Sequence, residues 1–267
     1  MSALLTFEPH RIAQKQSRGR SGVRFSIMGG DPRNARLCEI LTEEGREARL
    51  FLQEEIAEAA AFGDVIVLPV KGMAGDLFNG FLRDKQTLVT GEDFLSREDF
   101  AVLNAIPTAE GGLELAMSEM PVTLHGCEAL VVGYGRIGKL LCKNLSALGA
   151  AVTASARKDS DFSWMDAHGI RANHTLKLDG TLHRYDVIFN TVPHLTLTSA
   201  RLREVKQSCV IIDLASAPGG TDFKAAERLG LRCRWALSLP GKCAPESAAR
   251  YMRLVLGRIL AERGVGL

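Results

Sequence analysis

The sequence has 267 residues, 46% of them hydrophobic, which is enough for one large domain or two smaller ones with buried cores. Its charges nearly cancel, at a net +2 with 24% charged residues, which argues against a nucleic-acid-binding surface and against an acidic disordered chain. We therefore expect two domains and a small-molecule partner.

Six cysteines are scattered along the chain without the close pairs that bind zinc or cycle between thiol and disulfide. We expect reduced cysteines and no metal site. Residues 1–22 are basic but have no apolar core of the kind found in signal peptides, and no later apolar run approaches the roughly 20 residues that span a bilayer. The sequence predicts a cytoplasmic protein with a flexible N-terminal segment over 1–22, for which a targeting role is the alternative.

From residue 23 onward, short runs rich in Val and Ile alternate with longer stretches of helical period. This alternation predicts an α/β fold in which parallel strands are joined by crossover helices. The strands expected in the first part of the chain lie at 23–28, 48–52, 64–70 and 87–90. Those expected in the second part lie at 129–132, 151–156, 186–190, 209–214 and 231–236.

Both series open with a strand that ends in a glycine turn, SIMGGD and LVVGYG, which indicates two related α/β units in tandem. We expect two Rossmann-like, doubly wound domains with a cleft between them. The first, at 23–107, is the expected substrate domain and is completed by a C-terminal helix at 245–267. A connecting helix at 108–120 leads to the expected NADP-binding domain at 121–244.

The segment ALVVGYGRIG places three glycines between an apolar strand and an amphipathic helix, the context of a dinucleotide-binding turn. Gly133 permits the tight turn, Gly135 lets a pyrophosphate approach the backbone, and Gly138 lets helix and strand pack closely. The first N–H groups of the helix attract phosphates. We expect Tyr134, Arg136 and Ile137 of the same turn to contact the cofactor, although Arg136 is also explained as an exposed residue at a helix start.

The next strand ends without the acid that NAD enzymes use to hold the adenosine ribose. Ser155, Arg157 and Lys158 stand there instead, and a hydroxyl, a guanidinium and an ammonium suit a 2′-phosphate. We therefore predict NADP. In the alternative, Arg157 and Lys158 are solvated loop residues, and Asp159 or Asp161 holds the ribose of NAD.

Later strand ends supply the remaining expected contacts of the ribose and nicotinamide. These cofactor-binding candidates are Thr191, Val192, Pro193 and Leu214. His194 follows the proline; it is a candidate for proton transfer or an ordinary loop histidine.

Four stretches are more specific: GGDPRN, NAIPTAEGG, VVGYGRIGK and the long segment VIIDLASAPGGTDFKAAERLGLRCRWALSLPGKCAPESAARYM. In this order, and over nearly the whole chain after residue 22, they resemble the family of dipicolinate synthase A subunits. The resemblance implies a fold similar to the D-2-hydroxyacid and alanine dehydrogenases. It also implies oxidation of dihydrodipicolinate to dipicolinate with NADP in sporulating bacteria, beside a flavoprotein-like B subunit.

One departure from the hydroxyacid enzymes bears on the substrate. Those enzymes use a histidine as acid–base late in the cofactor domain, whereas the comparable stretch here, SLPGKCAPESA, contains none. A hydroxyacid substrate is therefore disfavoured.

A dicarboxylate substrate requires cations or free helix-start N–H groups to hold it, and its oxidation requires a proton acceptor. The substrate-binding candidates are Arg33, Lys71, Thr108, Ser216, Gly219, Gly220 and Lys242. The catalytic candidates are Glu110, Asp31 and His194. Each has a structural alternative: Arg33 and Lys71 as surface cations, Gly219 and Gly220 as turn formers, Asp31 as a helix N-cap before Pro32, and Glu110 as a favourable charge near a helix start capped by Thr108.

Two other functions remain open. One is a different NADP-dependent imine or amino-acid oxidoreductase on the same scaffold. The other is a non-catalytic NADP-binding regulatory subunit, which the lack of an unmistakable base suggests. The oligomeric state is left open.

Overall fold

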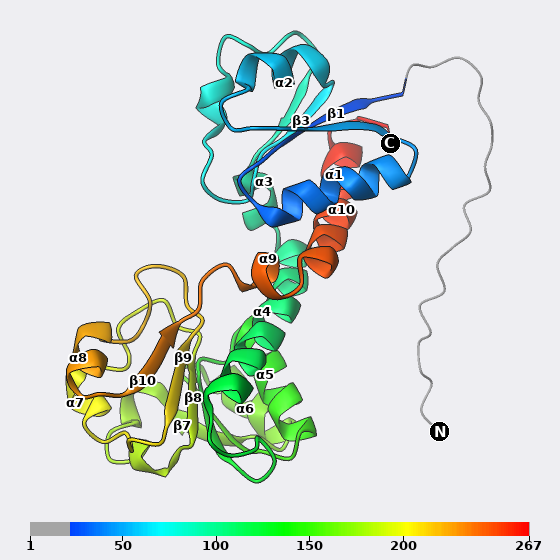
Figure 1. The fold of residues 1–267 in the computed structure, drawn as a ribbon. Helices are drawn as coiled ribbons and strands as arrows, with labels where there is room; N and C mark the ends of the chain where they lie inside the picture. Colours follow the sequence, from blue (N-terminus) through cyan, green and yellow to red (C-terminus); the bar gives the residue numbers. More distant parts are fainter. Residues whose placement is uncertain (1–21, 267) are drawn as a thin grey trace.

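The computed structural model describes residues 22–266, which form two lobes joined by a long helix (Figure 1). The flexible segment expected at 1–22 lies, apart from Gly22, outside these residues. In the first lobe, four parallel strands pair in the order β2-β1-β3-β4. Its strands and helices are β1 (Arg24–Met28), α1 (Pro32–Glu43), β2 (Glu47–Phe51), α2 (Ile56–Phe62), β3 (Val65–Val67), the 3₁₀ turn η1 (Gly75–Phe78), β4 (Thr87–Val89) and α3 (Gly91–Leu95).

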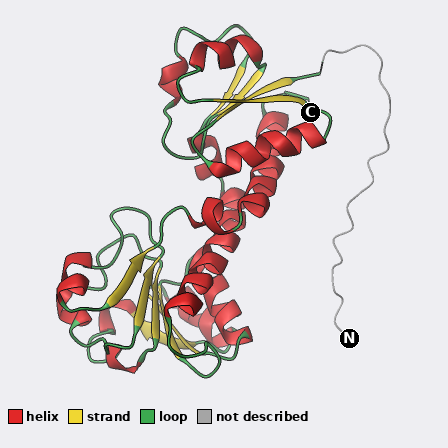
Figure 2. Ribbon diagram, viewed as in Figure 1, coloured by secondary structure: helices red, strands yellow, loops and turns green. Residues whose placement is uncertain are grey.

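The second lobe has six parallel strands in the order β10-β9-β8-β5-β6-β7, the order of a dinucleotide-binding Rossmann domain. Figure 2 shows helices on both faces of its sheet. Its elements are β5 (Glu128–Val132), α5 (Arg136–Ala147), β6 (Ala151–Ala156), α6 (Asp159–Ala167), β7 (Arg171–His174), η2 (Thr175–Lys177), η3 (Leu182–Arg184), β8 (Val187–Asn190), α7 (Ser199–Leu202), β9 (Val210–Asp213), α8 (Phe223–Arg228) and β10 (Arg232–Trp235). The expected α/β class, with two Rossmann-like lobes, is confirmed.

The helix that joins the lobes, α4 (Glu98–Glu119), is ten residues longer at its start than the sequence predicted. The predicted helix began just after Pro107, and proline lacks the N–H that would bond the carbonyl four residues earlier in the helix. In the structure Pro107 is buried inside the helix, which packs against α5 and the short helix α9 (Leu239–Cys243). Burial along both lobes therefore outweighs the cost of one missing hydrogen bond.

The last helix, α10 (Pro245–Glu262), returns to the first lobe and lies against α1 and α4 (Figure 1). Its buried side chains Met252, Val255 and Ile259 join the core formed by β1 and α1. Because this face recurs every three or four residues, the helix was predictable from spacing alone. The chain therefore crosses between the lobes twice, through α4 and through the α9 region.

The expected strands are all present, with ends that shift by at most three residues. One strand, β7, was missed because its sequence, RANH, is polar and its first two residues are exposed at the sheet edge. No helix among residues 22–266 is both long and apolar enough to cross a membrane.

Candidate functional site

The glycine turn between β5 and α5 has the backbone that a nucleotide phosphate requires. Gly133 has φ +98°, a conformation that glycine adopts without strain, and Gly135 caps α5. A Cβ on Gly138 would lie 2.2 Å from the carbonyl oxygen of Gly133, so glycine is needed for helix and strand to pack. The first N–H groups of α5 remain available to an anion.

A cavity of about 710 Å³ borders this turn. It runs between the ends of β6 and β8, the position at which Rossmann domains hold dinucleotides. The sequence-predicted residues that line it are Gly133, Tyr134, Gly135, Arg157, Lys158, Thr191, Val192, Pro193 and His194. Its size and its glycine turn fit a dinucleotide.

The other predicted cofactor contacts do not line this cavity: Arg136, Ile137, Gly138, Ser155 and Leu214. Ser155 is fully buried, and its hydroxyl accepts a hydrogen bond from Thr175 Oγ1 (3.3 Å), because its position on β6 turns it into the sheet core. The prediction that it receives a 2′-phosphate is therefore not supported by its position. Leu214 is also buried and packs against α4, where a Cβ on Gly112 would lie 3.0 Å from its Cδ1.

The cavity wall also includes side chains that the sequence did not single out. Thr175 and Leu176 come from the turn after the missed strand β7, and Arg201 comes from α7. Arg201 is largely buried, donates to Asp179 (2.9 Å) and to the carbonyl oxygen of Thr196 (2.9 Å), and so fixes the loop after β8. No local sequence pattern marks such a loop clamp.

The loops after β8 and β9 are held together by one buried carboxylate. Asp213, at 0% exposure, accepts hydrogen bonds from Asn190 Nδ2 (2.9 Å) and the backbone N of Ala215 (3.0 Å), and at its other oxygen from the N of Gly220 (2.9 Å) and Thr221 Oγ1 (2.7 Å). Every partner is a donor. The Asp213 side chain therefore fixes both loops that follow the strands beside the cavity.

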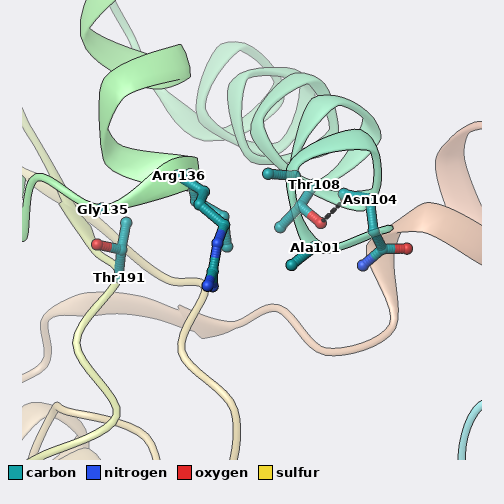
Figure 3. Close-up of a pocket in the computed structure, with 8 residues that line it drawn as sticks. Ala101, Asn104, Thr108, Gly135, Arg136 and Thr191 are labelled. Atoms are coloured by element: carbon teal, nitrogen blue, oxygen red, sulfur yellow. Dashed lines mark hydrogen bonds between the residues drawn. The ribbon is translucent and has the colours of Figure 1, made fainter. Parts of the chain in front are cut away.

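A smaller cavity of about 200 Å³ lies between α4 and the second lobe (Figure 3). One wall is the α4 face made by Ala101, Asn104, Ala105 and Thr108, which follow helical spacing. The other wall comes from the glycine turn and the end of β8, with Gly135, Arg136, Ile137 and Thr191. Because Gly135 and Thr191 border both cavities, a molecule bound here lies next to the nucleotide cavity.

Asn104 is the polar side chain of α4 best placed to donate into this smaller cavity. Arg33 Nη1 donates to its Oδ1 (3.2 Å), which leaves the amide NH₂ as the free end (Figure 3). The Thr108 hydroxyl, by contrast, donates to the carbonyl oxygen of Asn104 (2.8 Å) and is not free to donate to a ligand. Asn104 was missed because the predicted helix began only after it.

Asp31 and Arg33 form an ion pair with each other. Arg33 Nε lies 2.9 Å from Asp31 Oδ1, its Nη2 lies 2.5 Å from Oδ2, and Asp31 also caps α1 by accepting from the N of Arg33 (3.0 Å). The N-cap role is confirmed. The pair is mostly buried, at 10% and 12% side-chain exposure, so neither the proposed base nor the proposed carboxylate-binding cation is free.

Most of the other candidates lie outside both cavities. Glu110 is exposed on another face of α4, and Thr108 lines the smaller cavity from the helix interior rather than from its cap. Lys71, Lys242 and Ser216 are exposed and line neither cavity. Gly219 and Gly220 are buried under neighbouring side chains and backbone, and Gly220 is too close to the Asn190 side chain to accept a Cβ. Of the catalytic candidates, His194 alone lines a cavity.

Comparison with known proteins agrees with this architecture. Residues 87–218 match the family described as the NAD binding domain of D-isomer specific 2-hydroxyacid dehydrogenases. The A subunit of dipicolinate synthase from Bacillus subtilis is 28% identical over 288 residues, which cover 91% of this chain and 97% of the relative. The chain is similar to this A subunit over nearly its whole length.

Solved structures give the same result. The crystal structure of the dipicolinate synthase A subunit from Bacillus halodurans superposes with a TM-score of 0.79 at 28% identity, covering 90% of this chain and 98% of that one. A putative D-3-phosphoglycerate dehydrogenase from Ralstonia solanacearum shares the fold, with a TM-score of 0.66 at 14% identity over 91% and 95% of the two chains. The resemblance to dipicolinate synthase A subunits is confirmed, and the match of residues 87–218 to an NAD binding domain supports a nicotinamide cofactor and an oxidoreductase.

Proposed function

We propose that this chain is the A subunit of a dipicolinate synthase and oxidises dihydrodipicolinate to dipicolinate, with NADP accepting the hydride. The observation that carries the proposal is the end-to-end similarity to dipicolinate synthase A subunits, in sequence and in fold. We place the reaction in the cytoplasm during sporulation, beside a flavoprotein-like B subunit. Bound NADP would supply the hydride acceptor; one hydride and one proton leave the ring, which becomes aromatic.

The residues around the smaller cavity suit a flat dicarboxylate. The free NH₂ of Asn104 is a neutral donor to a carboxylate oxygen, and Arg136 on the opposite wall is a cation that pairs with Glu98 when no ligand is bound. The Asp31–Arg33 pair acts indirectly, because Arg33 orients the Asn104 amide through its Oδ1. His194 is the candidate for the group that takes up the proton, since it lines the adjoining cavity.

NADP is favoured over NAD by the charges at the end of β6. Arg157 and Lys158 line the nucleotide cavity, are exposed, and form no ion pair within residues 22–266. One acid, Asp161, lines the same cavity and would oppose a phosphate. Asp159, at the start of α6, is exposed and does not line the cavity. Two free cations favour a 2′-phosphate over a ribose hydroxyl.

The activity is tested by supplying freshly prepared dihydrodipicolinate and following reduced nicotinamide by absorbance, with NADP and with NAD, in the presence and absence of the B subunit. We expect turnover that prefers NADP. Nucleotide binding without turnover of this substrate, even when the B subunit is present, would support the non-catalytic regulatory alternative. Turnover of other cyclic imines or amino acids but not of this one would support the alternative oxidoreductase.

The cofactor assignment is tested by titrating an Arg157→Ala/Lys158→Ala double variant. The NADP Kd is expected to rise by about tenfold or more, since each cation loses a charge-assisted contact, while the NAD Kd changes little. An Arg203→Ala/Lys224→Ala variant, which removes two exposed cations outside the cavity lining, is the matched control. Equal loss of both nucleotides would overturn the NADP assignment.

The role of Asn104 is tested by Asn104→Asp. This change keeps the oxygen that accepts from Arg33 but removes the NH₂ and adds a charge that repels carboxylates. The KM for the dicarboxylate is expected to rise about tenfold or more, with nucleotide affinity unchanged. Asn144→Asp on α5, away from both cavities, is the control.

A further inference from the structure

A third cavity, of about 500 Å³, lies against α5 and the end of α6, outside the nucleotide site. We call it the α5–α6 cavity and define it by Tyr134, Lys139, Leu140, Lys143, His168 and Ile170. Tyr134 borders this cavity and the nucleotide cavity alike. Lys139 is the last residue of the VVGYGRIGK motif, and none of the proposed functions uses it or the other residues that line this cavity.

The inner wall of the α5–α6 cavity is apolar and uncharged. Tyr134, Cys142 and Ile170 are at most 7% exposed. Burial raises the pKa of the Cys142 thiol to about 12, and burial also raises the pKa of the Tyr134 phenol. Both groups are therefore neutral near pH 7, and no Asp or Glu of the described residues lines the cavity. This wall therefore suits contact with an apolar ring.

The Tyr134 hydroxyl and the His168 imidazole in the wall are already paired with each other. Tyr134 Oη lies 2.9 Å from His168 Nδ1, and the His168 ring lies 5.4 Å from the ring of Trp164, which is 54% exposed. A ligand therefore need not satisfy the buried Tyr134 hydroxyl. This leaves the two lysines as the charged groups of the lining.

Lys139 and Lys143 lie one turn apart on α5, so their side chains share one side of the helix. Both are exposed, and neither forms an ion pair in the described part of the chain. The Lys139 Nζ lies 5.6 Å from the ring centroid of Tyr134 and 5.9 Å from that of Trp164. The aromatic side chains thus hold one ammonium group at the cavity rather than in bulk solvent.

We propose that the α5–α6 cavity binds a small, planar aromatic carboxylate, with its ring against Leu140 and Ile170 and its carboxylate paired with Lys139 and Lys143. A neutral hydrocarbon would leave both cations unused. A polyphosphate would find neither a helix N-terminus nor the clustered donors that such groups need. The proposal does not depend on which reaction the cleft performs.

The test uses 2-naphthoate as the probe and isothermal titration calorimetry on the full chain saturated with NADP. Saturation with nucleotide keeps the probe out of the nucleotide cavity. We expect binding at one site per chain, and binding at least about tenfold weaker for 2-naphthalenemethanol, which has the same ring but no charge.

A Lys139→Met/Lys143→Met variant keeps the apolar stems and removes both charges. It is expected to weaken 2-naphthoate binding at least about tenfold while leaving nucleotide affinity and thermal stability unchanged. Lys224→Met, which removes an exposed lysine on α8, is the matched control and is expected to bind like the parent. A Ser146→Phe variant, which replaces a small side chain of the lining by a large one, is expected to reduce binding of both the acid and the alcohol.

Three results would overturn the proposal. The first is equal affinity of the double methionine variant and the parent for 2-naphthoate. The second is absence of binding once NADP is saturating. The third is a change in the oligomeric mass of the lysine variants, measured by sedimentation, together with no binding of the probe. That result would identify this face as a contact between copies of the chain.

Discussion

Arg136 in the glycine turn pairs with Glu98 at the start of α4, with its Nε 2.9 Å from both carboxylate oxygens. The pair connects the turn that receives a nucleotide phosphate to the helix that joins the lobes. Arg136 is predicted to contact the cofactor, and in the structure it shares its charge with Glu98. A bound pyrophosphate and Glu98 would therefore compete for the same guanidinium.

Glu98→Gln is expected to tighten binding of the dinucleotide, because it removes the competing charge while preserving the length of the side chain. Both partners are well exposed, at 53% and 68% side-chain exposure, so the gain should be about two- to fivefold rather than larger. Fluorescence titration with NADPH measures it. Glu92→Gln, an exposed acid on α3, is the control, and weaker binding by Glu98→Gln would contradict the competition.

Two glycines of the turn are expected to have different roles, Gly135 in nucleotide binding and Gly138 in the stability of the fold. A methyl at Gly135 meets no atom within 4 Å, so Gly135→Ala should keep the melting temperature but block the approach of the phosphates and weaken nucleotide binding about tenfold or more. A methyl at Gly138 meets the Gly133 carbonyl, so Gly138→Ala should lower the free energy of unfolding by about 2 kcal/mol. Calorimetry and urea unfolding of both variants check this; equal melting temperatures would contradict it.

The elements predicted well were those whose signals are local. The spacing of Gly133, Gly135 and Gly138 after an apolar strand identified the Rossmann lobe, because each glycine answers a requirement set by its near neighbours in the sequence. The periodic apolar face of α10 identified that helix. These patterns need no knowledge of distant residues.

The contacts that shape the cleft were not predictable in the same way. Glu98 lies 38 residues from Arg136, and Asn104 lies 71 residues from Arg33. No local sequence pattern predicts either pair. Asp31 and Arg33 are near neighbours, yet their pairing follows from burial beside α9, where Gly241 approaches Asp31. Two charged residues that were predicted to act on the substrate thus form an ion pair with each other in the folded chain.

The free energy of unfolding at acid pH is expected to depend on Asp99. The Arg97 hydrogen bond holds the pKa of Asp99 down, to about 2, with further lowering from Arg258 and the backbone N of Phe100, against the opposing effect of burial. Since the unfolded carboxyl titrates near 3.8, the contribution is fully present above about pH 5, is about half lost by pH 3, and disappears below the folded pKa.

Asp99→Asn should therefore lower the free energy of unfolding at pH 7 by about 1 kcal/mol, a modest value because the side chain is partly exposed. The difference from the parent should shrink as the pH falls from about 5 towards 3. Urea unfolding at several pH values measures it. A difference that stayed constant down to about pH 3 would mean that the Asp99 charge does not stabilise the fold.

Asp213 offers the sharpest test of how the loops beside the cavity are held. Because all four of its partners are donors, Asp213→Asn keeps the shape but places an NH₂ where an acceptor is needed. We expect the free energy of unfolding to fall by about 3 kcal/mol, together with faster hydrogen exchange at the backbone N–H groups of Ala215 and Gly220. Asp222→Asn, at the N-cap of α8, is the matched control, since Asn caps helices as well as Asp does and should change stability by less than about 0.5 kcal/mol. If the two variants were equally stable, the Asp213 carboxylate would not be what fixes the loops after β8 and β9.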